Sequence, residues 1–592
     1  MEKRLVLAIV LSFLVIFGFQ AFLARNQKPA PVPAAPETAP AAVQGPGAAG
    51  TTQVQAPAVE AEPAPAVPAP AAAQVPVSAE KRETITVKTG LYEATWSNKG
   101  GVLTGWALKK HKSYEKTDFE LVPEAAGKPG LPFPFSVSLE DPALGARLNG
   151  MDYVWESDLE PVTVPPDAAS ARKDEVAYVL DVPSGGTGEL RFTYADGASV
   201  RIEKVLRFRD GVYPIEIEIR VWKDGVLLPS SFLWGPGIGR MSEKEQKVRN
   251  ATMGGTSASG AVFYANGRPQ RLAERGYKPE FAAPTAPNWA AYEDQYFTAL
   301  FVFPGRIGQA AFVKETAEGG AGFYLAVQAS SPAAPNAKVL GYIGPKESEA
   351  LVAFGHGTKA VIRYSKFLGL NLKPIAEIML AGVKLCYRVV PNWGLAIILL
   401  TIVIKLLFFP LTYSSTKSMA RMAELQPKVK ALRAKYKKSK TDIEQRRQMN
   451  EEMMRLYKEE GINPAGGCLP LLIQLPVFVA VYQMLATAIE FRNSPFIPFW
   501  ISDLSVRDKT FALPILMGGT QFITQKMTPT SADPTQAKMM LIMPFIMTFF
   551  FVSAQSGLVL YWLTTNVLQI GQQALINHMM ARHKKDAHGK RK

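Results

Sequence analysis

The chain has 592 residues, a formal net charge of +15 and a mean hydropathy close to zero. Two cysteines, Cys386 and Cys468, and five histidines leave no disulfide framework and little for a metal site. The P-loop, GxSxG, HExxH and CxxC motifs are absent, and the glycines of Gly235-Pro236-Gly237-Ile238-Gly239 are wrongly spaced for a dinucleotide loop. The sequence therefore predicts neither enzymatic chemistry nor a cofactor or metal.

Residues 1–25 form a predicted N-terminal transmembrane anchor. Leu5 to Leu23 are apolar except for Ser12 and Gln20, and at ~1.5 Å per residue a helix of this length crosses the hydrocarbon core. A cleaved signal peptide is the alternative, but no clear A-x-A site follows. Residues 26–80 are an Ala/Pro-rich linker, whose composition favours an extended tether.

Residues 81–362 change to short alternating runs. Thr84–Val87, Leu91–Trp96 and Val212–Val221 have the period of half-buried strands. Turn pairs separate such runs, among them Asp210-Gly211 and Asn266-Gly267. We therefore predict an all-β sandwich domain, without a recognisable catalytic set.

Residues 363–388 are predicted to form an amphipathic helix. Their charges recur at spacings of 7, 4, 7 and 4, which places them on one helical stripe: Lys366, Lys373, Glu377, Lys384 and Arg388. Such a helix suits a membrane interface, although packing against the sandwich would give the same pattern.

Five further apolar spans follow, which gives an α-helical polytopic bundle of six transmembrane helices. The second span is 389–411, and the third to sixth lie within 462–580. The last two share 539–580, which contains no Asp, Glu, Lys or Arg, with a predicted turn at Ser553–Gly557.

Charge sets the predicted topology. Residues 412–463 carry 13 Lys/Arg against 7 Asp/Glu, the tail 581–592 carries six against one, and residues 490–509 carry three of each. The positive-inside rule then places both termini in the cytoplasm and residues 26–388 in the periplasm of a bacterial inner membrane. Because topology accounts for most of the charge, we expect no nucleic-acid target.

Lys405 is a cation deep inside the second span. It either extends to the cytoplasmic headgroups or faces a water-filled cavity in the bundle. Helical side chains lean toward the helix N-terminus, here the outer side, and Thr401 lies one turn away on the same face, so the cavity is favoured.

Uncharged polar side chains line the later spans. Trp562, Asn566, Gln569 and Gln573 fall on one stripe of the last span, Gln521 and Gln525 lie in the fourth, and Gln474 lies in the third. Such groups often only bond neighbouring helices. The absence of carboxylates from spans two to six argues against a proton-coupled transporter.

Residues 412–461 are predicted to form a cytoplasmic helical hairpin, with helices at Ser415–Lys437 and Asp442–Glu460. Methionines recur at helical spacing on both arms. The hairpin either buries its own seam or acts as a mobile lid for apolar clients.

Several motifs resemble the YidC/Oxa/Alb membrane protein insertase family. They include Phe409-Pro410-Leu411-Thr412, the run from Asn463 to Phe478, and Ser556-Gly557-Leu558-Val559-Leu560-Tyr561-Trp562. The large outer domain resembles the Gram-negative form, in which it is a β-super-sandwich. The family usually has Arg where this chain has Lys405, and commonly Tyr where it has Trp562.

The resemblance implies insertion and folding of nascent membrane proteins through a hydrophilic groove open to cytoplasm and lipid. The implied groove residues are Lys405, Thr401, Trp562, Gln521, Gln525, Asn566 and Gln569. Implied client-sliding or structural residues are Gln474, Pro476, Phe478 and Pro544. Expected partners are nascent membrane proteins, membrane lipids, the Sec translocon and the ribosome, the last through the hairpin and basic tail. The alternatives are a secondary transporter, which favours inverted repeats, and a membrane-tethered periplasmic scaffold.

Overall fold

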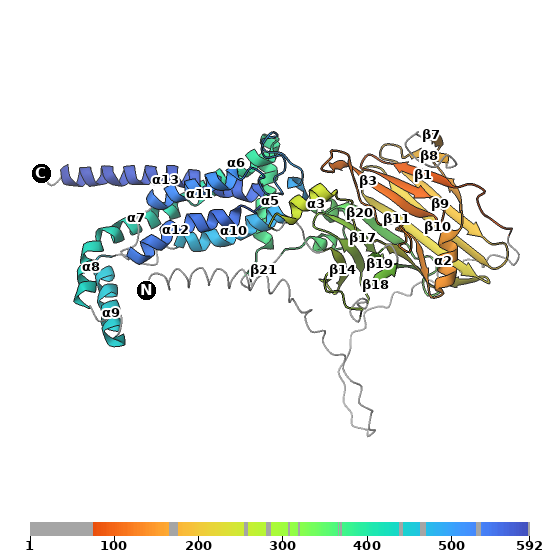
Figure 1. Ribbon diagram of the computed structural model, residues 1–592, viewed down its shortest axis with the longest axis horizontal. Helices are drawn as coiled ribbons and strands as arrows, with labels where there is room; N and C mark the ends of the chain where they lie inside the picture. Colours follow the sequence, from red (N-terminus) through yellow and green to blue (C-terminus); the bar gives the residue numbers. More distant parts are fainter. Residues whose placement is uncertain are drawn as a thin grey trace, which may run out of the picture. The chain divides into compact units, whose positions relative to one another are not determined.

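The computed structural model describes residues 75–589 except 165–175, 254–258, 280–285, 306–307, 318–319, 365, 368–369, 437–441, 462–468 and 528–533 (Figure 1). The predicted anchor 1–25, most of the linker 26–80, the loop of the hairpin and the last three residues of the tail lie outside the described residues.

The N-terminal half of the described chain is a β domain. Its ten-stranded sheet has the order β15 (Arg268–Ala273), β14 (Gly260–Ala265), β16 (Trp289–Glu293), β17 (Phe297–Val302), β20 (Val339–Pro345), β11 (Pro214–Lys223), β10 (Val200–Arg209), β9 (Thr187–Ala195) and β6 (Val154–Ser157), with β12 (Val226–Leu228) paired to β11. Its six-stranded sheet has the order β4 (Asp118–Glu120), β3 (Val102–Lys112), β2 (Tyr92–Ser97), β1 (Glu83–Lys88), β8 (Val176–Asp181) and β7 (Pro161–Val164).

A third sheet of four strands has the order β18 (Ala310–Ala317), β19 (Gly320–Ser330), β13 (Ser230–Trp234) and β5 (Val137–Leu139). Aromatic side chains fill the space between the sheets. Trp96 of β2 contacts Phe192 of β9 and Phe208 of β10, with ring centroids 6.3 and 6.5 Å away. The two larger sheets therefore pack face to face, as their alternating sequences require.

The predicted strands are confirmed to within two residues at their ends. In β11, Ile215, Ile217, Ile219 and Val221 are all buried, as period-two alternation demands. Gly211, Asn266 and Gly267 adopt the positive φ angles that the turn pairs predicted.

The expectation of a purely all-β domain needs correction, because three short helices interrupt the strands: α2 (Pro142–Gly150), α3 (Glu243–Asn250) and α4 (Ser348–Phe354). Local capping explains the first two. Asp141 accepts hydrogen bonds from the N–H groups of Ala143 and Leu144, and Ser242 accepts one from Glu245 N–H.

The amphipathic helix predicted from residue 363 begins later. Lys366–Phe367 and Leu370–Asn371 pair as a small hairpin, β21–β22, and α5 spans Lys373–Val389 with Pro374 in its first turn. Lys366 therefore lies outside the helix. Proline favours the first helical turn and disfavours helix before it, which sets this start.

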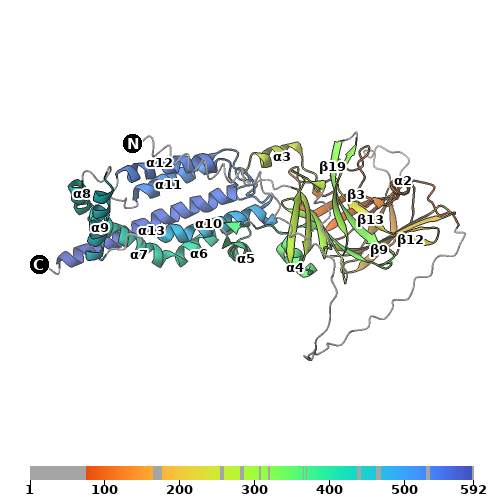
Figure 2. The same cartoon turned by 90° about the horizontal axis from the view of Figure 1, so that it is seen from below.

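The C-terminal helices are α6 (Trp393–Leu407), α7 (Phe409–Glu424), α8 (Gln426–Lys435), α9 (Ile443–Glu459), α10 (Leu469–Thr487), α11 (Ala512–Met527), α12 (Pro534–Phe551) and α13 (Ser556–Gly589). Helices α10, α11 and α13 run side by side (Figures 1 and 2). The predicted turn between the last two spans is confirmed at 552–555.

Two helix ends within the predicted segments are set by proline. Helix α6, within the predicted second span, ends at Leu407, and Pro410 lies in the first turn of α7. The first hairpin arm breaks at Leu425, and Pro427 opens α8. Helix α13 continues to Gly589, into the predicted basic tail.

The methionine-lined hairpin seam is confirmed where it is described: Leu425, Val429 and Tyr457 are buried against Met422, Met453 and Leu456. Among the described helices, none alone is long and apolar enough to cross a membrane. Helices α5 and α6 reach that length and hydropathy only as a pair, bent by 118°.

Candidate functional site

Lys405 lies in the last turn of α6, half-buried, and its ammonium group is directed at α13. Its Nζ donates a hydrogen bond to Oε1 of Gln569 at 2.9 Å. Gln572 Nε2 donates to the backbone carbonyl of Lys405 at 3.2 Å. No carboxylate among the described residues forms an ion pair with this ammonium group. The described side-chain partner of this ammonium group is thus a neutral amide.

We call Lys405, Gln521, Trp562, Asn566 and Gln569 the polar cluster. Within it, Trp562 of α13 contacts three other helices. Its Nε1 donates to Oε1 of Gln521 on α11 at 3.0 Å. Its ring stands edge-on to Phe478 of α10, with centroids 4.7 Å apart, and lies 5.3 Å from Phe551 of α12. The N–H edge of this indole is therefore hydrogen-bonded, while its ring packs among aromatic side chains.

Asn566 lies one turn further along α13. Its Nδ2 donates to the Met517 carbonyl at 3.2 Å and lies 3.4 Å from Thr520 Oγ1, both on α11. Gln525 is half-buried one turn beyond Gln521. The predicted stripe of α13 thus faces α6 through Gln569 and α11 through Trp562 and Asn566, and these helices bring the predicted groove residues together.

Thr401 departs from the expected pattern. Its side chain is 1% exposed, and its hydroxyl donates to the Ile397 carbonyl of its own helix at 2.7 Å. The polarity of Thr401 is therefore satisfied within α6, which is the usual behaviour of threonine in apolar helices.

The remaining predicted residues lie on α10 and α12. Gln474 Nε2 donates to the Tyr561 hydroxyl at 3.0 Å, two residues before Pro476, which lies inside α10. Pro544 is buried inside α12, and its carbonyl accepts a hydrogen bond from Thr548 Oγ1 at 2.8 Å. Gln474 thus bonds a neighbouring helix, and Pro544 accepts a bond within its own helix. Both kinds of contact are common in ordinary helix packing.

Three residues of this site were missed from sequence: Gln572, Tyr561 and Phe551. Gln572 and Tyr561 each lie next to a predicted residue, so a wider stripe would have included them. Phe551 carries no polar signal. Among the described residues no group of three His, Cys, Asp or Glu side chains could hold a metal ion.

A second, buried cluster was not anticipated. Arg492 Nη2 lies 2.7 Å from Glu245 Oε1, Arg249 Nε lies 2.9 Å from the same oxygen, and Arg249 Nη2 lies 3.8 Å from Asp503 Oδ2. All four side chains are at most 3% exposed. Two come from α3 of the β domain and two from the loop between α10 and α11, so the cluster ties that loop to the β domain.

Comparisons with known proteins match both regions. A family described as "60Kd inner membrane protein" matches residues 385–584, and one described as "YidC periplasmic domain" matches residues 84–378. Proteins named membrane protein insertase YidC from Syntrophus aciditrophicus and Geobacter metallireducens are 34% and 33% identical, over 98% of this chain and 99% of theirs. The one from Geobacter sulfurreducens is 35% identical over the same shares.

Solved structures include an active YidC insertase with its first transmembrane domain resolved. It is 19% identical, covers 84% of this chain and 93% of its own, and has a TM-score of 0.34.

Proposed function

We propose that this chain, which belongs to the YidC family of membrane protein insertases, inserts nascent proteins into the bacterial inner membrane along the polar cluster between α6, α11 and α13. The observation that carries the proposal is the ammonium group of Lys405, which donates to the neutral amide of Gln569 and forms no ion pair with a described residue. A lone cation in such a place attracts an anionic or polar segment of a client without holding it through a permanent ion pair.

The proposed mechanism involves no covalent chemistry. The polar cluster hydrates the client's polar tail and shortens the low-dielectric barrier that the tail must cross. The client's apolar segment moves along the apolar faces of α10 and α12, where Leu475, Phe545 and Phe549 are exposed. Burial of ~20 apolar client residues in lipid supplies the driving force.

We further propose the finer topology: six spans, both termini in the cytoplasm and residues 26–388 in the periplasm. Helix α5 suits the membrane interface. Ile378 and Leu385 are more than 60% exposed, whereas Lys359 pairs with Glu377 and Lys384 pairs with Glu349 and Glu490. Cooperation with the Sec translocon, and contact of the hairpin and tail with ribosomes or lipid headgroups, belong to the same proposal.

Substitution of Lys405 tests the mechanism. Lys405→Arg should retain insertion, whereas Lys405→Glu should reduce it on the order of tenfold for clients with acidic tails, since ~1.4 kcal/mol of lost attraction gives that factor. The assay is protease protection of a radiolabelled client inserted into proteoliposomes. Lys417→Glu, an exposed charge change on α7, is the matched control. Equal insertion by all variants would contradict the role of Lys405.

Two further experiments separate the alternatives. A chain lacking residues 27–361 should still rescue insertion in depleted cells if the helical region is the insertase, whereas a tethered scaffold requires that domain. A cysteine at position 405, in a background lacking Cys386 and Cys468, should react with a membrane-impermeant reagent added from the cytoplasmic side. Protection of that cysteine from both sides would mean that water does not reach the cluster.

A further inference from the structure

The loop between α10 and α11 contains an uncharged stretch of chain. Residues 493–502 include no Asp, Glu, Lys or Arg, although Arg492 precedes them and Asp503 follows them. Within this stretch Pro495 and Pro498 are exposed, and Phe499 is 92% exposed. We call residues 495–500 the apolar turn. Single exposed apolar side chains are common, but a contiguous group of them usually marks a contact surface.

Local hydrogen bonds close the apolar turn. The carbonyl of Ile497 accepts hydrogen bonds from the N–H groups of Trp500 at 2.9 Å and Ile501 at 2.8 Å. Pro498 and Phe499 therefore occupy the two central positions of a β-turn, and proline favours the first of these positions. Phe499 thus stands at the tip of the turn.

The apolar turn is attached to the N-terminal ends of two helices. On one side, Asn392, the N-cap of α6, donates from Nδ2 to the Phe496 carbonyl at 3.0 Å. The Phe496 ring lies against Gly394, since a Cβ at Gly394 would be 2.2 Å from that ring. On the other side, Trp500 Nε1 donates to Thr510 Oγ1 at 2.8 Å, two residues before α11. These contacts place the turn beside the first turns of α6 and α11.

Exposed apolar side chains also occur at the neighbouring helix ends. Val389 is the last residue of α5, Leu395 lies in the first turn of α6, and Phe511 directly precedes α11; all three are exposed. Trp393, the first residue of α6, stacks on Tyr387 of α5 with ring centroids 4.0 Å apart. Aromatic rings at helix ends are typical of the boundary between membrane and water.

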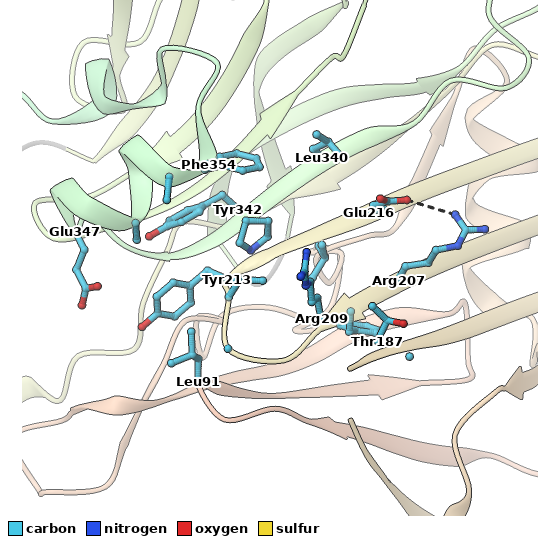
Figure 3. Close-up of a pocket in the computed structure, with 18 of the residues that line it drawn as sticks. Leu91, Thr187, Arg207, Arg209, Tyr213, Glu216, Leu340, Tyr342, Glu347 and Phe354 are labelled. Carbon is cyan, nitrogen blue, oxygen red and sulfur yellow. Dashed lines mark ion pairs between the residues drawn. The ribbon is translucent and has the colours of Figure 1, made fainter. Parts of the chain in front are cut away.

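The β domain has a surface of a different kind. Its cavity of about 870 Å³, beside β10, β11, β20 and α4, is lined by five carboxylates and three cations, among them the paired Arg207 and Glu216 (Figure 3). Such a surface favours contact with water, because the transfer of ionised groups to an apolar medium is costly. The apolar turn has no ionised side chain, so its contact with acyl chains avoids this cost.

We propose that the apolar turn inserts into the outer leaflet of the membrane and holds the N-terminal ends of α6 and α11 at a fixed depth. The inference rests on the proposed topology, which places this loop on the periplasmic side. Phe499 lies among the acyl chains just below the headgroups. The two prolines suit this place, because they have no backbone N–H that would lack a partner in lipid. Since α6 carries Lys405 in its last turn, the depth of α6 also sets the depth of that ammonium group.

A fluorescent label on the turn tests the contact with lipid. Phe499→Cys, in the full chain without Cys386 and Cys468, is labelled with nitrobenzoxadiazole and placed in nanodiscs of phosphatidylcholine and phosphatidylglycerol. Phe499 is exposed, so the variant should fold. We expect phosphatidylcholine with a nitroxide on its acyl chain to quench the label, and iodide in the water to leave it nearly unquenched.

Val226→Cys, labelled in the same way, is the matched control, because Val226 is an exposed apolar residue of β12 in the β domain. It should be quenched by iodide and not by the nitroxide lipid. Equal behaviour of the two labels, or quenching of the label at position 499 by iodide alone, would overturn the proposal. Protection of that label from both quenchers would mean that protein covers the turn, and would also overturn it.

The depth of α6 tests the anchoring role. A label on Leu395→Cys reports this depth through the ratio of its quenching by nitroxides near the headgroup and near the end of the acyl chain. Phe499→Asp should shift the ratio, because a carboxylate favours water over acyl chains, whereas Phe499→Leu should preserve it. An unchanged ratio in Phe499→Asp would show that the turn does not set the depth of α6.

This proposal and the proposed function can fail separately. If iodide quenches the label at position 499 while Lys405→Glu loses insertion, only the anchor fails. If the nitroxide lipid quenches that label while Lys405→Glu inserts normally, the insertion mechanism fails and the anchor stands.

Discussion

Replacing Arg492 by methionine should destabilise the chain strongly, because it leaves two buried carboxylates, Glu245 and Asp503, with Arg249 as their one counter-charge among the described residues. The cluster holds two cations and two anions: Arg249, Arg492, Glu245 and Asp503. Burial lowers the pKa of Arg492 and raises that of Asp503, which are the directions expected when charges lose water. Removing one partner from a buried ion pair costs ~3–5 kcal/mol.

The size of the effect follows from burial rather than from the ion pair itself. Arg492 also stacks on Phe119, with its guanidinium carbon 4.3 Å from the ring centroid, and donates to the Lys112 carbonyl at 3.0 Å. Arg492→Met keeps much of the stacking but leaves Glu245 and Asp503 to share the charge of Arg249. Glu245→Gln should cost a similar amount. The double variant should cost less than the sum, because Arg249 and Asp503 remain a neutral pair.

The assay is thermal unfolding of the full chain in detergent, followed by intrinsic fluorescence. A loss of ~3–5 kcal/mol, divided by the unfolding entropy of a β domain of this size, should lower its melting temperature by roughly 5–8 °C. Lys247→Met is the matched control. Lys247 lies on α3, the helix of Glu245, and the two side chains of its ion pair with Glu243 are 81% and 90% exposed, so the loss of this ion pair should change stability little. Equal melting temperatures for Arg492→Met and Lys247→Met, or strict additivity in the double variant, would refute the reasoning.

Two further predictions concern other sites. Burial lowers the pKa of Lys204 to about 7, so between pH 7 and 10 the unfolded chain binds a proton that the folded chain has released, and stability from this group rises with pH. Three backbone carbonyls accept hydrogen bonds from Lys204 Nζ and favour its charged form, so the melting temperature should rise only modestly from pH 7 to 9. Lys204→Met should abolish this dependence of the melting temperature on pH. An unchanged dependence in the variant would show that Lys204 is not its cause. Gly518→Ala should destabilise the contact of α11 with α12, because the added Cβ would lie 1.9 Å from Thr548 Oγ1. In the control Gly519→Ala the added Cβ meets nothing within 4 Å, so this change should be neutral or slightly stabilising. Equal melting temperatures for the two variants would contradict the prediction.

The predictable part of the fold is the part fixed by local pattern. Strand β11 follows from the alternation of Ile215, Ile217 and Ile219, and the seam of the hairpin follows from methionines at helical spacing. The stripe of α13 was also predictable, because Asn566 and Gln569 are polar residues in an apolar run. Boundaries failed where a proline competes with the hydropathy pattern, as at Pro410 and Pro427, or where a cap such as Asp141 starts a helix inside a β region.

Contacts between distant segments were not predictable, since no local pattern encodes them. Arg492 and Glu245 are 247 positions apart, and each alone resembles an ordinary exposed charge of a loop or short helix. Lys405 is the opposite case. A single cation in an apolar span can be recognised from the sequence alone, and the structure adds its hydrogen-bond partner, Gln569. An unusual residue in an apolar context therefore reveals a site from sequence, whereas an ordinary charged residue reveals one only after the chain has folded around it.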